Sequence, residues 1–109
     1  MTFIEVQVFT RDIQSLMSDD EYRDLQRRLI ANPTEGVLIP GGGGLRKLRW
    51  VSRQKRKGKR GGVRVIYYLG ARDRIYMVSA YSKSSKDDMT HGQLKAMRAL
   101  VKKGLYEGC

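Results

Sequence analysis

The segment LRKLRWVSRQKRKGKRGGVRVIYYL, residues 45–69, decides how the rest of the chain is interpreted. Ten Lys or Arg residues lie between Arg46 and Arg64, and no Asp or Glu interrupts them. The whole chain holds 22 basic and 11 acidic residues, so its formal net charge of +11 is concentrated almost entirely in this segment. An evenly spread excess would indicate only a basic protein, whereas such a local concentration indicates a surface that holds phosphates.

Residues on either side of the basic run alternate with the period of two that is typical of β-strands. The sequence predicts strands over residues 45–51 and 63–69, joined by a basic turn. Lys47 and Arg49 share one face of the first of these strands. A further strand over residues 75–81 follows a tight connection, so the three strands are expected to form an antiparallel meander.

A first strand and a short helix are predicted near the N-terminus. Residues 2–9 alternate between two faces and are rich in β-branched and aromatic side chains, so they predict a strand. Thr10 is expected to cap a short helix over residues 10–17 through its side-chain hydroxyl. This helix would begin where the strand ends.

The second helix has a clear start and a clear end. Residues Ser18 to Glu21, Ser-Asp-Asp-Glu, form a capping box in which the Ser18 side chain accepts from the backbone N–H of Glu21. Pro33 prevents the helix from continuing. Residues 34–44 contain four consecutive glycines but match neither a Walker loop nor a dinucleotide-binding turn, so a flexible lead-in to the next strand is favoured over a nucleotide site. The apolar stripe of the second helix, which begins after Ser18, is expected to comprise Tyr22, Leu25, Leu29 and Ile30.

A second capping box, formed by Thr90 and Gln93, predicts a terminal helix that ends near Gly104. The elements together predict a single α+β domain over residues 1–109, in the order β-α-α-β-β-β-α. We expect an antiparallel sheet of about four strands with the two N-terminal helices packed on one face, together with the C-terminal helix. The apolar stripe of the terminal helix is expected to comprise Leu94, Met97, Leu100 and Val101.

Composition argues against several classes of protein. No apolar run approaches the roughly 20 residues that span a bilayer, and the N-terminus does not have the pattern of a signal peptide. The basic run contains glycines that break a helix, so nucleic acid is favoured over a membrane surface as the acidic partner. The single cysteine, Cys109, favours a reducing cytoplasm. Because His91 is the only histidine, a histidine pair is impossible, and we expect neither a metal nor another cofactor.

Three motifs together resemble one protein family. They are GGLRKLR at residues 43–49, KGKRGGVRVIYY at residues 57–68, and a last strand that ends in AYSK at residue 83. In this order they resemble the HigB branch of the RelE superfamily, the toxins of bacterial type II toxin–antitoxin systems. The resemblance implies a small endoribonuclease that enters the ribosomal A site, cleaves messenger RNA without a metal and thereby inhibits translation. It also implies a HigA-like helix-turn-helix antitoxin, a toxin–antitoxin hetero-oligomer that binds its operator DNA through the antitoxin, and a location in the bacterial cytoplasm.

The resemblance also implies which cations take part in catalysis. It matches the strand-borne cations after GGL to Lys47 and Arg49, and the arginine after GG-x to Arg64. Arg64 would clamp the phosphate through its fork of donors, because cleavage by the 2′-hydroxyl of RNA requires stabilisation of a charged phosphorane. The lysine that follows the last strand is Lys83, which we expect to protonate the leaving group where neighbouring cations favour proton loss. A solvated, non-functional cationic face is the alternative for each of these residues.

The general base is left open by the sequence. Several family members have a tyrosine near the start of the C-terminal segment, where this chain has Thr90, and the nearest candidate is Tyr81. Tyr68 and Tyr81 are also candidates for stacking on a base. The remaining cations of the basic turn are expected to contact ribosomal or messenger RNA: Arg53, Lys55, Arg56, Lys57, Lys59 and Arg60.

Two other functions stay open. A non-catalytic RNA-binding or ribosome-associated module would have the same basic hairpin. A DNA-binding protein is disfavoured, because the cations lie on a hairpin and no helix carries a row of base-reading side chains.

Overall fold

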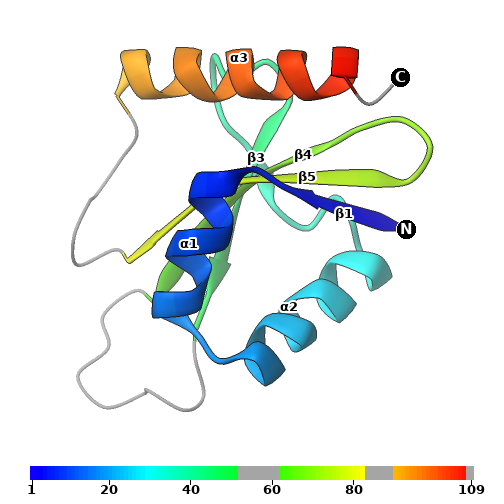
Figure 1. Ribbon diagram of the computed structural model, residues 1–109, viewed down its shortest axis with the longest axis vertical. Helices are drawn as coiled ribbons and strands as arrows, with labels where there is room; N and C mark the ends of the chain where they lie inside the picture. The colour runs from blue at the N-terminus through cyan, green and yellow to red at the C-terminus, as the bar shows by residue number, and fades with distance from the viewer. Residues whose placement is uncertain (52–61, 83–89, 108–109) are drawn as a thin grey trace.

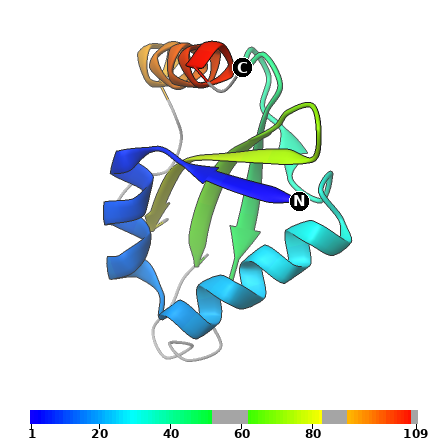
Figure 2. The ribbon, with the colours of Figure 1, turned by 45° about the vertical axis from the view of Figure 1, so that its right-hand side comes forward.

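A five-stranded sheet separates two layers of helices in the computed structural model (Figure 1). The structure describes residues 1–51, 62–82 and 90–107, the last four by their backbone alone. The strands are β1 (Thr2–Glu5), β2 (Val37–Leu38), β3 (Leu45–Trp50), β4 (Val63–Leu69) and β5 (Arg74–Ser82). The helices are α1 (Gln7–Leu16), α2 (Asp19–Ala31) and α3 (His91–Glu107). Helices α1 and α2 cover one face of the sheet, and α3 covers the other (Figure 2).

The sheet has the order β1-β5-β4-β3-β2 and is mixed. Strands β3, β4 and β5 form the predicted antiparallel meander. The predicted α+β class is confirmed, whereas the predicted antiparallel sheet of about four strands differs from the observed sheet in two details. Strand β1 pairs with β5 in parallel, and the segment predicted as a loop contributes β2, which pairs antiparallel with β3. A two-residue strand is too short to show an alternating pattern, and a parallel partner lies far away in the sequence.

The first strand ends at Glu5, whereas the alternation of residues 2–9 predicted a longer one. Helix α1 starts at Gln7, because Phe9, Ile13 and Met17 recur every four residues and bury their side chains under the sheet. This longer helical stripe overrides the short alternating pattern. The predicted cap at Thr10 was also wrong. Val6 is the N-cap residue, and the Thr10 hydroxyl donates to the Glu5 carboxylate at 2.6 Å.

The two predicted capping boxes begin helices α2 and α3. The Ser18 hydroxyl accepts from the backbone N–H of Glu21 at 3.2 Å. Thr90 and Gln93 bond reciprocally: the Gln93 N–H donates to the Thr90 hydroxyl, and the Thr90 N–H donates to the Gln93 side-chain oxygen. The predicted stripes were too wide by one residue each, because Ile30 and Leu100 are 51% and 41% exposed.

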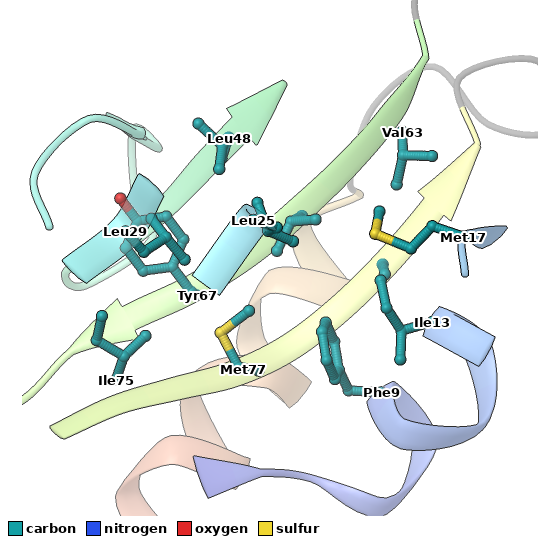
Figure 3. Close-up of a cluster of buried hydrophobic side chains, with 12 residues drawn as sticks. Phe9, Ile13, Met17, Leu25, Leu29, Leu48, Val63, Tyr67, Ile75 and Met77 are labelled. Carbon is teal, nitrogen blue, oxygen red and sulfur yellow. The ribbon is translucent and has the colours of Figure 1, made fainter. Parts of the chain in front are cut away.

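The larger core lies between the sheet and helices α1 and α2 (Figure 3). Leu25 and Leu29 of α2 and Phe9 of α1 point toward the inner faces of β4 and β5. Tyr67 is fully buried in this core, and its hydroxyl donates to the Pro33 carbonyl at 2.7 Å and accepts from the Gly36 N–H at 2.9 Å. The smaller core lies beneath α3 and consists of Leu45, Ile66, Tyr76, Val78, Tyr81, Leu94, Met97 and Val101.

Candidate functional site

A row of three side chains crosses the sheet on the face that α3 partly covers. Arg49 of β3 lies opposite Arg64 of β4, and Arg64 lies opposite Tyr81 of β5. Residues directly opposite on antiparallel strands share a face and have Cβ atoms roughly 5 Å apart. Lys47 lies two residues before Arg49 and therefore on the same face, in the next row beside Ile66. The prediction that Lys47 and Arg49 share a face is confirmed, and the register adds Arg64 and Tyr81 to that face.

These four side chains differ in their exposure. Arg49 is exposed and Lys47 is half-buried, whereas Arg64 and Tyr81 are only 8% and 7% exposed. Arg49 and Arg64 are directly opposite each other on neighbouring strands, so the register brings two cations together at one point of the sheet. The exposed Arg49 and the half-buried Lys47 thus share a face with the buried Arg64, an arrangement suited to a phosphate.

Two tyrosines were predicted to stack on RNA bases, and the structure places them differently. Tyr81 belongs to the core beneath α3 and is buried. Tyr68 is half-buried, and its ring centroid lies 6.3 Å from that of Tyr76. Of the two, Tyr68 offers the more accessible ring.

The strand ends next to this row are tied to α2. The Trp50 indole N–H donates to the Glu21 carboxylate at 3.0 Å, and the Arg28 guanidinium lies 5.4 Å from the centre of the Trp50 ring. Gly62 directly precedes β4 with a φ of +66°, and a Cβ there would lie 2.3 Å from the Trp50 carbonyl oxygen. Sequence reasoning missed this anchor, because it used Glu21 only as a capping residue. The buried Glu21 and the indole together hold the end of β3 beside Arg49 and Arg64.

Several predicted residues lie outside the described part of the chain. They are Lys83 and the cations of the basic turn, Arg53, Lys55, Arg56, Lys57, Lys59 and Arg60. Within the described part, Arg46 differs from its neighbours on β3, because it lies on the opposite face and donates to the carbonyl oxygens of Thr34 and Gly36. Arg46 thus holds the chain before β2 in place, and its cation is not part of the row.

The two parts of the sequence on either side of residue 38 carry net charges of opposite sign. Residues 1–38 hold four basic and seven acidic residues, for a net charge of −3, whereas residues 39–109 hold eighteen basic and four acidic residues, for +14. On α2 the cations are paired: Arg23 with Asp20, Arg27 with Asp24, and Arg28 with Glu35. The long-range attraction for a polyanion therefore comes from residues 39–109, the part of the chain that contains β3, β4 and α3.

Among the described residues, no three His, Cys, Asp or Glu side chains are grouped so that they could hold a metal ion. His91 is exposed at the start of α3. Across residues 1–51, 62–82 and 90–107, no helix has both the length and the apolar character that a membrane span requires.

Comparisons with known proteins agree with this fold. The sequence profile of the family described as "RelE toxin of RelE / RelB toxin-antitoxin system" matches residues 6–106. A solved structure of a double arginine-to-alanine mutant of the E. coli toxin RelE in the free state is similar in fold, with a TM-score of 0.59 and 11% sequence identity. The similarity covers 90% of this chain and 93% of that one. Because the family profile spans almost the whole sequence, the chain belongs to the RelE toxin family of toxin–antitoxin systems.

Proposed function

We propose that this toxin is an endoribonuclease that cleaves messenger RNA in the ribosomal A site and so inhibits translation. The observation that carries the proposal is the cross-strand row of Arg49, Arg64 and Tyr81, with Lys47 on the same face. Membership of the RelE family supports the role of a toxin, and the row supplies cations where a phosphorane would need them.

The reaction begins with attack of an RNA 2′-oxygen on the adjacent phosphorus. The bond from phosphorus to the 5′-oxygen breaks, which leaves a 2′,3′-cyclic phosphate and a free 5′-hydroxyl. Arg64 binds the non-bridging oxygens, because it lies opposite Arg49 on the same face and a guanidinium can present two parallel donors to a phosphate. Lys47 and Arg49 add positive charge at the same phosphate. Stabilisation of this kind requires no metal, since the fixed cations neutralise the developing charge.

Two protons must move in this reaction. Tyr81, which would act as its phenolate after loss of its own proton to water, is our candidate for the group that accepts the 2′-hydroxyl proton, since it lies directly opposite Arg64. We assign protonation of the 5′-oxygen to Lys83, which follows the last residue of β5 in the sequence.

The proposed partners follow from the resemblance of the sequence motifs to the HigB branch. The motifs GGLRKLR and KGKRGGVRVIYY support assignment to the HigB branch. We propose a HigA-like helix-turn-helix antitoxin as the partner, which forms a hetero-oligomer with the toxin and carries it to the operator DNA. The site of action is the ribosome in the bacterial cytoplasm.

Induced expression in a bacterium tests this function. Wild-type protein should arrest growth, and Arg64→Ala should relieve the arrest. The matched control is Arg72→Ala, which removes the same charge from the exposed turn before β5 and should leave the arrest intact. On purified ribosomes, Arg64→Ala should slow messenger RNA cleavage by about 100-fold or more. Unimpeded growth at confirmed expression of the wild-type chain would reject the proposal.

A non-catalytic RNA-binding module is the second candidate, because the ten cations between Arg46 and Arg64 would hold RNA without chemistry. A messenger RNA with a 2′-deoxy nucleotide at the cleaved position separates the two functions. The enzyme should bind this RNA but leave it intact. A binding module should inhibit translation equally with both RNAs and give no fragments from either.

A further inference from the structure

An open groove of about 200 Å³ lies between the glycine-rich loop before β3 and the middle of α3. Its floor is apolar and consists of Leu45, Val101 and the half-buried ring of Tyr68. Leu45 and Tyr68 lie opposite each other on β3 and β4, on the same face of the sheet as the row that contains Arg64. The groove thus lies on the same face of the sheet as that row and is lined by different residues.

Two cations from α3 form the rim of the groove. Arg98 and Lys102 are exposed, and they lie four residues apart and so on one side of the helix. Arg98 donates from one guanidinium nitrogen to the Gly41 carbonyl oxygen at 3.1 Å, which ties the loop to the helix. Neither Arg98 nor Lys102 has an ion pair with any residue that the structure describes. Their charge is therefore available to a ligand.

The loop has a specific conformation that only glycine adopts easily. Gly41, Gly43 and Gly44 have positive φ angles of 73°, 62° and 105°. A Cβ on Gly43 would lie 3.3 Å from Nε of Arg98, and one on Gly44 would lie 2.7 Å from the Tyr68 ring. The backbone therefore packs directly against the cation and the aromatic ring of the groove. The expectation of a flexible lead-in was based on sequence motifs alone, and those motifs cannot show that α3 returns to this loop.

We propose that this groove binds one nucleotide of the RNA strand that the toxin holds. The phosphate lies on Arg98 and Lys102, and the base lies against the ring of Tyr68. A nucleotide fits the groove because it combines an anion with a flat apolar face, and each base can stack on an aromatic ring. An acidic peptide would use the cations and leave the aromatic floor without a matching partner.

One RNA strand can occupy both the groove and the row that contains Arg64. The pair of Leu45 and Tyr68 lies four residues along the hairpin from the pair of Arg49 and Arg64, which corresponds to roughly 13 Å at about 3.3 Å per residue. A single strand of RNA covers that distance with a few nucleotides. This inference rests on the proposed function for the identity of the ligand, and it adds a subsite that holds the strand at a distance from the cleaved linkage.

Binding of an RNA that cannot be cleaved tests the groove separately from the chemistry. The probe is a short fluorescent single-stranded RNA with every 2′-hydroxyl methylated, and its affinity is measured by anisotropy. The double variant Arg98→Gln/Lys102→Gln should lose about 10-fold or more in affinity and show a salt dependence that is shallower by about one to two phosphates. The control Lys95→Gln/Lys103→Gln removes the same charge from exposed positions on α3 that do not line the groove, and should lose about twofold or less.

Tyr68→Leu tests the aromatic floor, and should weaken binding of the same probe by about fivefold or more. Thermal unfolding of each variant checks that the fold is retained. Equal losses in the two glutamine pairs, with cleavage by the wild type intact, would overturn the groove and leave the proposed function standing. Loss confined to Arg98→Gln/Lys102→Gln would support the groove even if the wild type failed to cleave RNA. Weaker antitoxin binding with unchanged RNA binding would show a peptide surface and overturn the proposal.

Discussion

The two faces of the sheet differ in how completely they are covered. Helices α1 and α2 bury a core of twelve residues on one face, and the cations of α2 are paired with carboxylates. On the other face α3 covers a smaller core of eight of the described residues, and on that face Lys47 is half-buried and Arg49 is exposed. Both faces use the same strands: Arg64 stands between Val63 and Val65, which point into the larger core. The larger core therefore lies on one face, and the candidate site lies on the other.

The largest stability effect should come from the fully covered face. Leu25→Ala removes a fully buried side chain and should lower the free energy of unfolding by about 2–5 kcal/mol. Leu94→Ala on α3 is the matched change on the open face, where the side chain is 8% exposed, and should cost less. Urea unfolding measures both. A larger loss in the free energy of unfolding for Leu94→Ala than for Leu25→Ala would contradict the proposed difference between the two faces.

Adjacent tyrosines on β4 sharpen the comparison, because they point to opposite faces. Tyr67→Phe leaves the Gly36 N–H and the Pro33 carbonyl without their partner and should cost about 1–3 kcal/mol. Tyr68→Phe removes a hydroxyl from a half-buried ring and should change stability by less than about 0.5 kcal/mol. The two chemical-denaturation midpoints should therefore differ clearly. Equal midpoints would mean that the buried hydroxyl contributes nothing.

Alkaline pH should weaken the α1–α2 side through Tyr22. Burial, and then its hydrogen bond to Glu5, raise the pKa of Tyr22 above its usual value, so the folded state favours the neutral phenol. Because the folded pKa is the higher one, the contribution of Tyr22 is complete below the unfolded pKa of about 10 and is lost as pH rises above it. Between about pH 9 and pH 11, wild type should lose more stability than Tyr22→Phe. An identical pH dependence for both proteins would contradict this assignment.

The helix caps, one on each side of the sheet, should give modest effects. Ser18→Ala and Thr90→Ala each remove a side-chain acceptor for a backbone N–H and should cost about 1 kcal/mol. Thermal unfolding measures both losses. If only the face that α3 covers carries RNA contacts, Thr90→Ala should also weaken RNA binding slightly, whereas Ser18→Ala should not. The reverse result would place the RNA on the other face.

The hairpin could be predicted from sequence because its signals are local. Alternation placed Lys47 and Arg49 on one face, and capping boxes located the starts of α2 and α3. The parallel pairing of β1 with β5 could not be predicted in the same way, since its partners lie about 70 residues apart in the chain. The alternation of residues 6–9 was misleading, because Phe9 belongs to a helical stripe that continues to Met17.

The same distinction applies to the candidate sites. The motif GG-x-R made Arg64 a candidate, but only the register shows that Arg49 and Tyr81 are its cross-strand neighbours. Arg98 and Gly41 are separated by 57 residues, and no local pattern relates them. The anchor between Glu21 and Trp50 was hidden for the same reason.

The most direct test of the central claim is a double-mutant cycle on messenger RNA cleavage by purified ribosomes under single-turnover conditions. Arg49→Ala, Arg64→Ala and the double variant are compared with wild type. If the two arginines act on one phosphate, the double variant should lose far less than the product of the two single losses, because side chains that act as a unit are non-additive. Single losses that multiply, or that stay within about twofold of wild type, would show that the cross-strand row is not one catalytic site.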